Sequence, residues 1–470
     1  MKLIKNTVTK NIGLIIVTPI LINFLFNNKM GFQYNPSVNL MEFLSSILLF
    51  LFLLTVGKAF MEATNKKFSR TTGIITYLIS FYLFETITLF FLRNINLHIT
   101  FLIVNFLWII FFIFKIKNKK YLILNFLSFM TLRTFNTLNF QEFEKNKNIN
   151  GDVKEVFYLN TQNIYNDSLF SSITNPVMQG YPQFMSYIDA LIFKISFYEV
   201  QYIFMIQTTY VFLWLFILLF CEMKFNNTNK IGVVIFFVCL TLNSDWLNFL
   251  FLSSLMSERL ASYIFLGLLL NLLNSKNENN LIVAFSAIIF SFTFLTKQFF
   301  SLILLFIFIL FLLNKNYKKY SAFLLFAYFL REIAHLTYFK NIPKDHHISQ
   351  IDLNDTILDI LLFRNLNFDN ILSILKNLYR DIPSTYLIII YILSSIIFYL
   401  LTKEFKSINT VFIFLPLLNF IFIFLLYISV WKNMELESPV RYIYSFIPIF
   451  LVSTFWNLEK IQKYIMNQKL

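Results

Sequence analysis

Long runs of apolar residues recur along almost the whole chain, and they constrain the fold more than any other feature. Many of them hold about 17–22 residues, enough for a helix to cross the hydrocarbon core of a bilayer. Only 14% of the 470 residues are charged and 57% are hydrophobic, whereas a soluble protein of this size needs more charge on its surface. The runs lack the two-residue alternation of a transmembrane β-barrel. The sequence therefore predicts an all-α, polytopic membrane protein.

Fourteen apolar runs are candidates for transmembrane helices. They cover residues 12–28, 41–57, 72–92, 99–114, 121–138, 200–220, 231–247, 259–273, 281–296, 299–314, 320–338, 384–402, 408–430 and 442–458. An even number of spans places both termini on the same side of the membrane. Lysine-rich turns recur on alternate loops, at 58–70, 115–120, 224–230, 315–319 and 403–406. Because basic residues mark cytoplasmic loops, we expect a multi-pass protein of the bacterial plasma (inner) membrane with both termini in the cytoplasm.

The net charge of +14 comes largely from these turns, so it does not indicate a nucleic-acid partner. The same orientation places two long polar loops outside, at 139–199 and 339–383. In the first loop, apolar spacing predicts helices at Val153–Tyr165 and Met185–Phe197, both lying on the membrane surface. The turn at 115–120 suggests two parts, a four-helix segment 1–115 and a core 116–470.

The first outer loop carries two acids one helical turn apart, Asp152 and Glu155. Residues at this spacing share one face of a helix. An outward-facing carboxylate there could deprotonate or position the hydroxyl or amine of an acceptor. The alternative is that both are ordinary solvated charges on a surface loop.

Charged residues also stand at the outer ends of later spans. Glu258 begins one apolar run, Lys297 lies between two runs, and Arg441 with Tyr442 opens the last run. Lys and Arg at such positions can hold a phosphate. The alternatives are an interfacial cap for Glu258, snorkelling to lipid headgroups for Lys297, and an interfacial anchor for Arg441 and Tyr442.

Motifs for metal, nucleotide or protease chemistry are weak or absent from the sequence. His346 and His347 are adjacent, a spacing that seldom ligates one ion, and Cys221 and Cys239 have no metal-site spacing. There is no P-loop, no Gly-rich dinucleotide turn, no G-x-S-x-G and no H-E-x-x-H. No cofactor is predicted; a divalent metal is possible but not indicated.

The segments GDVKEVFYLNTQNIYND and GYPQFMSYIDALIFKI resemble the first outer loop of the GT-C class of integral membrane glycosyltransferases. This superfamily includes the protein mannosyltransferases and the aminoarabinose transferases of lipid A. Asp152 matches the acidic position of the family and Glu155 its frequent second acid. Tyr181 and Pro182 match the start of a proline-containing segment, where Gln183 replaces the second proline of the family.

Three later segments are similar to the family in the same order. Glu258 in SSLMSERLASYIF takes the place of the family's acid at the start of a span. Lys297 in LTKQ takes the place of the lysine in the family's Lys-bearing hairpin. Arg441 and Tyr442 in RYIYSFIPIF match the start of a last span. The similarity covers about residues 121–458. In the family the catalytic loop follows the first span, whereas here it follows the fifth.

The resemblance implies a GT-C-like fold and an enzyme, a hexosyl- or pentosyltransferase. Its donor would be a polyprenyl-phosphate sugar, and its acceptor a lipid, glycan or protein of the cell envelope. Asp152 and Glu155 would be catalytic, and Tyr181, Pro182, Gln183, Glu258, Lys297, Arg441 and Tyr442 would bind substrate among membrane lipids. The alternatives are a flippase or transporter for lipid-linked saccharides, and a polysaccharide polymerase or ligase.

Overall fold

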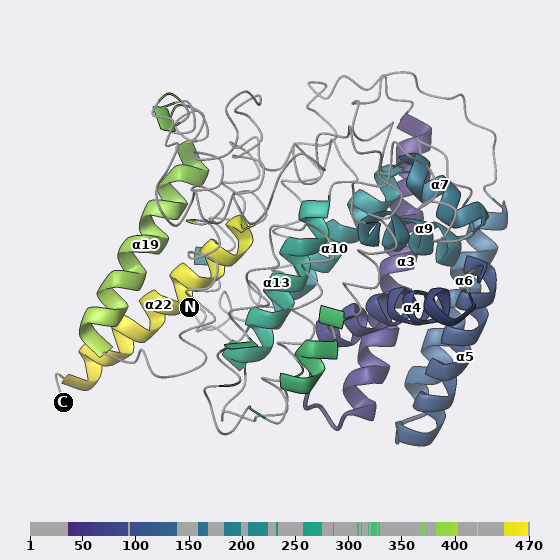
Figure 1. Cartoon of the computed structure of the whole chain (residues 1–470), viewed down its shortest axis with the longest axis horizontal. Helices are drawn as coiled ribbons and strands as arrows, with labels where there is room; N and C mark the ends of the chain where they lie inside the picture. Colours follow the sequence, from purple (N-terminus) through teal and green to yellow (C-terminus); the bar gives the residue numbers. More distant parts are fainter. Residues whose placement is uncertain are drawn as a thin grey trace, which may run out of the picture.

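The computed structural model describes residues 36–92, 95–138, 158–167, 183–198, 205–223, 257–274, 382–402 and 446–468, with short pieces between 232 and 421. This part of the chain is all-α and contains no strand (Figure 1). Its helices are α3 (Pro36–Ala63), α4 (Arg70–Leu92), α5 (Leu97–Lys115), α6 (Lys120–Leu138), α7 (Leu159–Asn166), α9 (Phe184–Ser196), α10 (Met205–Glu222), α13 (Ser257–Asn274), α19 (Ile382–Thr402) and α22 (Ile447–Gln468).

All of these helices except α7 and α9 cover stretches that the sequence predicts as membrane spans. Three contain segments long and apolar enough to cross a membrane: Phe43–Ala63 in α3, Leu97–Lys115 in α5 and Thr385–Thr402 in α19. This is the character expected of a membrane protein. The total of fourteen spans stays a prediction, because six of them lie wholly or largely outside the described residues. These six are 12–28, 231–247, 281–296, 299–314, 320–338 and 408–430.

Proline and asparagine fix where several helices begin. Pro36 is the first residue of α3, and Pro383 and Pro448 are the second residues of α19 and α22. Proline suits the first turn because its missing N–H has no partner within the helix there. Asn96 caps α5, and its side chain accepts the backbone N–H of His98 at 2.8 Å. These starts therefore follow from the local sequence.

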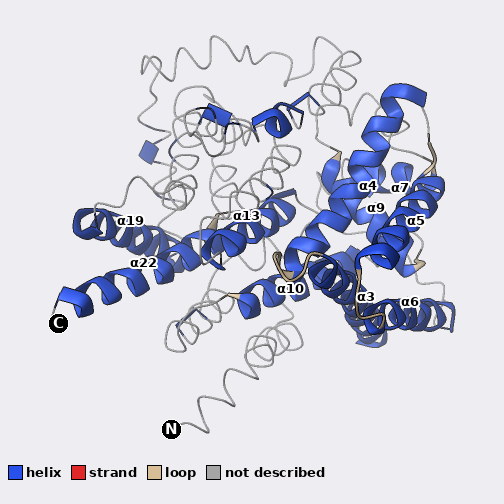
Figure 2. Ribbon diagram, turned by 90° about the horizontal axis from the view of Figure 1, so that it is seen from below, coloured by secondary structure: helices blue, strands red, loops and turns tan. Residues whose placement is uncertain are grey.

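Helix α3 packs against α4, α6 and α10 and is central to the larger group of helices (Figure 2). It runs antiparallel to α6, since Ser45 bonds to Asn136 at one end while the rings of Phe52 and Phe129 meet further along, 5.4 Å apart. This is the direction that the predicted alternation of spans requires. The side of the membrane that each end faces stays a prediction.

Helices α19 and α22 form a second pair, drawn at the left of Figure 1. They run parallel, because Tyr391 contacts Phe450 at 4.8 Å between ring centroids and Phe398 contacts Trp456 at 5.3 Å. Parallel neighbours in a membrane need a connection that crosses back between them. The predicted span 408–430 lies in that connection. Helix α13 contacts both α22 and α10 and so joins the pair to the larger group.

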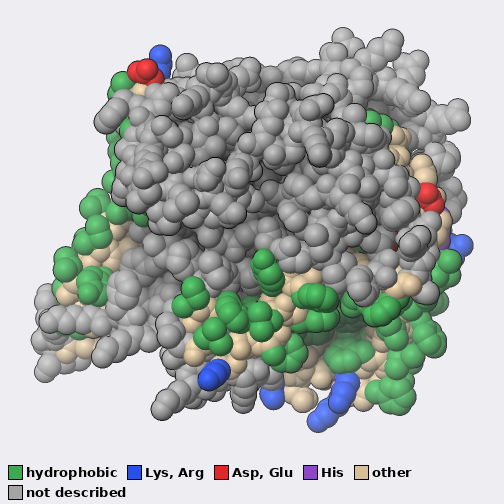
Figure 3. All heavy atoms as spheres, viewed as in Figure 1, with side chains coloured by type: hydrophobic (Ala, Val, Ile, Leu, Met, Phe, Trp, Pro, Cys, Tyr) green, Lys and Arg blue, Asp and Glu red, His purple; other side chains and the backbone are tan. Residues whose placement is uncertain are grey.

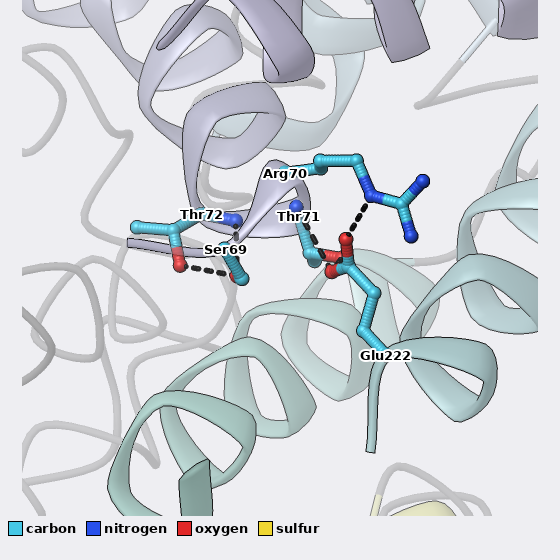
Figure 4. A network of polar contacts seen from close by, with 5 residues as sticks. All are labelled: Ser69, Arg70, Thr71, Thr72 and Glu222. Carbon is cyan, nitrogen blue, oxygen red and sulfur yellow. Dashed lines mark hydrogen bonds and ion pairs between the residues drawn. The ribbon is translucent and has the colours of Figure 1, made fainter. Parts of the chain in front are cut away.

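The ends of α3, α5 and α10 meet the start of α4 at what we call the basic end. The ring of Phe60 lies 5.8 Å from Trp108 and 6.3 Å from Phe111, and Arg70 pairs with Glu222 at 2.6 Å (Figure 4). Six exposed lysines lie in or directly beside the two turns at this end: Lys66, Lys67, Lys115, Lys117, Lys119 and Lys120. Figure 3 shows Lys and Arg side chains along the lower edge of the described surface, below apolar ones.

Helices from both sides of the predicted boundary at residue 115 share one hydrophobic core. Helix α3 packs on α6 and α10, and α4 contacts α13. The approach of α13 to α4 is close, because a Cβ added at Gly267 would collide with the side chain of Ile75. The division into 1–115 and 116–470 stays a prediction.

Candidate functional site

Helices α7 and α9, from the first long polar loop, cover the end of the helices opposite the basic end. We call this the capped end. Helix α7 packs on α9, and α9 contacts α3, α4, α6 and α13; Figures 1 and 2 both place α7 beside α9. The backbone N–H of Leu97, at the start of α5, donates to the carbonyl of Asp167 at the end of α7, 3.3 Å away. The described parts of the loop therefore form a layer across the bundle.

Helix α9 lies within one residue of the predicted Met185–Phe197, which confirms a helix there. Its surroundings differ from a membrane surface, because every residue of the helix except Lys194 is buried. The apolar residues favour one side of the helix, as the sequence predicts, but Ser186, Asp189 and Ser196 on the other side are buried as well, so protein rather than water covers that side. The second helix, α7, spans Leu159–Asn166 and confirms a helix over the last part of the predicted Val153–Tyr165, whereas residues 153–157 lie outside the described residues.

A buried polar network fixes the C-terminal end of α9. The carbonyl of Ser196 accepts a hydrogen bond from the side-chain amide of Asn136 in α6. Ser45 of α3 donates to the other side of that amide at 3.0 Å and accepts from Gln207 of α10 at 2.8 Å. Hydrogen bonds between buried polar side chains are costly to break in a low-dielectric interior, so they hold their helices in one arrangement. This network sets the position of α9 relative to three helices of the bundle.

Phe197 ends α9 in the left-handed region, with φ of 60°. Its backbone N–H and that of Tyr198 bond back to Lys194 and Phe193 and so close the last turn. A non-glycine residue in this conformation is strained by about 1 kcal/mol or more. The ring of Phe197 packs against Phe129, 5.6 Å away, and under the guanidinium of Arg133, 5.4 Å away. These contacts with α6 offset the strain.

A buried carboxylate on α4 holds the middle of α9. The hydroxyl of Tyr187 donates to Glu85 Oε2 at 2.8 Å, and Glu85 is 1% exposed. Burial and the neighbouring charge of Glu85 raise the pKa of Tyr187 well above 10, so the hydroxyl remains a neutral donor. The ring of Tyr82 packs edge-on against Tyr187, at 5.4 Å, and against Phe184, at 4.6 Å. The contact positions α9 on α4.

Lys194 places a cation at the capped end. Its amine lies 2.6 Å from Nε2 of His98 in α5 and 4.9 Å from the ring centre of Tyr165 in α7. The amine and the imidazole nitrogen are within hydrogen-bond distance, and the face of the Tyr165 ring attracts a cation. Burial lowers the pKa of Lys194 to about 8. These contacts tie Lys194 to α5 and α7.

The pKa of Lys194 gives a testable dependence of stability on pH. The pKa is about 8 in the folded chain and 10.5 for a free side chain. Between these values the unfolded chain binds more protons, so the free energy of unfolding should rise with pH from about 8 to about 10. We expect thermal midpoints of the wild type to increase over this range relative to Lys194→Met, whereas Lys463→Met should track the wild type. A difference between the wild type and Lys194→Met that stays constant with pH would contradict the shift.

Two of the predicted site residues fall in the described part of the chain. Gln183 immediately precedes α9, its side chain is buried, and its carbonyl accepts the N–H of Tyr187 at 2.9 Å. Glu258 lies in the first turn of α13, a helix that contacts α9. The other seven lie outside the described residues: Asp152, Glu155, Tyr181, Pro182, Lys297, Arg441 and Tyr442. The site roles of all nine stay predictions.

Metal ligation has no support from the residues that the structure describes, where no group of three or more His, Cys, Asp or Glu side chains could hold an ion. His346 and His347 lie outside them. The need for a divalent metal is therefore left open by the structure.

Comparison of the chain with protein-family models, with curated proteins and with solved structures finds no match. The resemblance to GT-C glycosyltransferases therefore depends on the sequence segments alone. A function for the chain must be inferred from its own residues and from how its helices are arranged.

Proposed function

We propose that the chain is a GT-C-type membrane glycosyltransferase that moves a sugar from a polyprenyl-phosphate donor to a cell-envelope acceptor. The observation that carries this proposal is the position of α7 and α9. These helices belong to the loop that contains Asp152, and they cover the end of the bundle opposite the lysine-rich turns. A polar loop folded onto one end of a membrane bundle can hold a site facing water, since irregular backbone must avoid lipid.

The proposed chemistry is a substitution at the anomeric carbon of the donor sugar. The acceptor hydroxyl or amine forms a bond to that carbon, and the bond between the carbon and the phosphate oxygen breaks. The acceptor proton passes to Asp152, with Glu155 one helical turn away as the second catalytic acid, and the electron pair leaves with the phosphate. Lys297 and Arg441 neutralise this departing charge, which is electrostatic stabilisation of a leaving group. Atoms and charge balance without a redox partner.

The remaining residues position the substrates in this scheme. Tyr181, Pro182 and Gln183 lead directly into α9, and Glu258 opens α13, which contacts α9. The buried bonds of Tyr187 and Ser196 would hold this layer rigid while the acceptor and donor meet. The isoprenoid tail would lie among apolar helix faces. The site would face outside, with both termini in the cytoplasm.

A flippase for lipid-linked saccharides is the second candidate, and Glu85 favours it. An ionisable residue inside a predicted span is a frequent mark of a transport pathway. Glu85 is the one charged residue between 72 and 92. However, it is buried and accepts the Tyr187 hydroxyl, which fits a structural role equally well. A polysaccharide polymerase or ligase remains the third candidate.

The test compares mass spectra of cell-envelope glycans from cells with and without the gene. We expect the loss of one sugar residue from a glycan, lipid or protein, together with accumulation of its polyprenyl-phosphate donor. If the sugar composition is unchanged and the glycan stays on the inner leaflet, the chain is a flippase rather than a glycosyltransferase. Loss of long polymers with unaltered repeat units would indicate the polymerase or ligase.

A further inference from the structure

Helices α5 and α6, joined by the turn at residues 116–119, carry large apolar side chains that are exposed on the surface of the bundle. On α5, Phe106 is 62% exposed and Phe114 is 80% exposed; on α6, Phe126 is 62% exposed. Further exposed Leu and Ile side chains follow the same helices: Ile99, Leu102, Leu107, Ile109, Ile113, Ile123 and Leu127. Exposed apolar surface of this extent marks a contact with lipid or with another protein.

The composition of α5 favours lipid over a partner helix. Helices that pack together in membranes bring small residues such as Gly, Ala and Ser to their interfaces. Helix α5 contains no Gly, Ala or Ser, and its single Thr100 is buried against the protein. In α6, Ser128 is half-buried, and the exposed positions around it are Phe126, Leu127, Met130 and Thr131, whose hydroxyl bonds to the backbone of its own helix. Acyl chains can cover such irregular apolar faces without close backbone contact.

Four exposed lysines stand where the two apolar faces meet the turn: Lys115, Lys117, Lys119 and Lys120. No Asp or Glu occurs between Glu85 and Glu142, and none of these lysines forms an ion pair with a residue that the structure describes. Lys66 and Lys67 add charge from the neighbouring turn at the basic end. By contrast, Lys463 in α22 pairs with Glu459 at 2.7 Å, and Lys460 lies over the ring of Trp456 at 5.3 Å.

We propose that this end of α5 and α6 binds the headgroups of anionic phospholipids. An apolar face that ends in lysines without an ion-pair partner among the described residues matches the acyl chains and the phosphate layer of one leaflet. Lysines near an anionic leaflet each contribute affinity, and the interaction decays within a Debye length. This binding is independent of the proposed sugar transfer, and it goes beyond the role of basic residues in setting orientation, because it makes the chain selective among lipids.

The experiment counts lipids bound to the purified full-length chain by native mass spectrometry. The probes are phosphatidylglycerol and phosphatidylcholine with the same acyl chains. We expect the wild type to prefer phosphatidylglycerol. In the variant K115Q/K117Q/K119Q/K120Q this preference should fall by at least about five-fold. A five-fold change corresponds to about 1 kcal/mol, which is the contribution of a single lysine near the membrane surface.

Matched variants separate the site from general charge. Changing the same four lysines to arginine should keep the preference, and K460Q/K463Q should change it by less than about two-fold, because those lysines already have partners. A preference that survives in the four-Gln variant overturns the proposal, as does an equal loss in K460Q/K463Q.

Two further outcomes bear on the proposal. If the four-Gln variant shifts from a dimer to a monomer with its lipid preference intact, the face is an interface between copies and the proposal is wrong. If that variant does not insert into the membrane, the test is the salt dependence of lipid binding by the wild type. Added salt must weaken an electrostatic preference for phosphatidylglycerol. A preference for phosphatidylglycerol that is insensitive to salt would then overturn the proposal.

Discussion

Replacing Asp152 with asparagine is expected to abolish sugar transfer while the protein still inserts into the membrane. Asparagine keeps the size of the side chain but cannot take a proton from the acceptor. Positioned general bases contribute about 10²–10⁴-fold to reaction rates, so transfer by the variant should fall by that factor. The measurement is the release of polyprenyl phosphate and the appearance of glycosylated acceptor in vesicles that contain the purified chain.

Asp167→Asn supplies the matched control from the same loop. Its side chain is exposed, and its two hydrogen bonds, to Asn163 and from Leu97, use backbone atoms that the substitution leaves in place. We expect transfer by this variant to equal the wild type. Undiminished transfer by Asp152→Asn would remove Asp152 as the base, and Glu155→Gln would then test the neighbouring acid. If deleting the gene removes no sugar residue from the cell envelope, the proposal that the chain is a glycosyltransferase is itself wrong.

Hydropathy predicts the helices well because the bilayer demands long apolar runs. The predicted span 99–114 corresponds to α5 at Leu97–Lys115, and 384–402 to α19 at Ile382–Thr402. Boundaries fail where the helix continues into polar sequence. Helix α22 begins at Ile447, next to Pro448, and extends to Gln468, ten residues past the predicted end. The ion pair between Glu459 and Lys463, four residues apart, supports that extension, and hydropathy does not detect it.

The packing of polar residues could not be predicted, because the partners are far apart in sequence. Glu85 bonds to Tyr187, and Asn136 reaches Ser45 and Ser196. One signal for Glu85 was present in the sequence, since a lone acid within a predicted span usually faces the protein interior. Its partner on α9 could not be predicted, because α9 was expected on the membrane surface, where its tyrosine would meet water.

Removing the carboxylate of Glu222 is expected to cause the largest loss of stability among single changes at the basic end. One oxygen accepts Arg70 Nε at 2.6 Å, and the other accepts the backbone N–H of Thr71 at 3.2 Å and its hydroxyl (Figure 4). Glu222 is therefore an acceptor for the first turn of α4, where unpaired N–H groups and the helix dipole favour negative charge. The Ser69 hydroxyl is a second acceptor at the start of α4, where it accepts the backbone N–H of Thr72 at 3.1 Å.

We expect Glu222→Ala to lower the free energy of unfolding by about 2–3 kcal/mol, which is below the range for fully buried pairs because Arg70 is 31% exposed. Glu222→Gln should cost about half as much, since the amide oxygen still accepts from Thr71. Midpoints of thermal unfolding in detergent measure both. Glu459→Gln is the control: its partner Lys463 is largely exposed, so the loss should be below about 1 kcal/mol. Equal losses in Glu222→Ala and Glu459→Gln would mean that α10 does not anchor the start of α4.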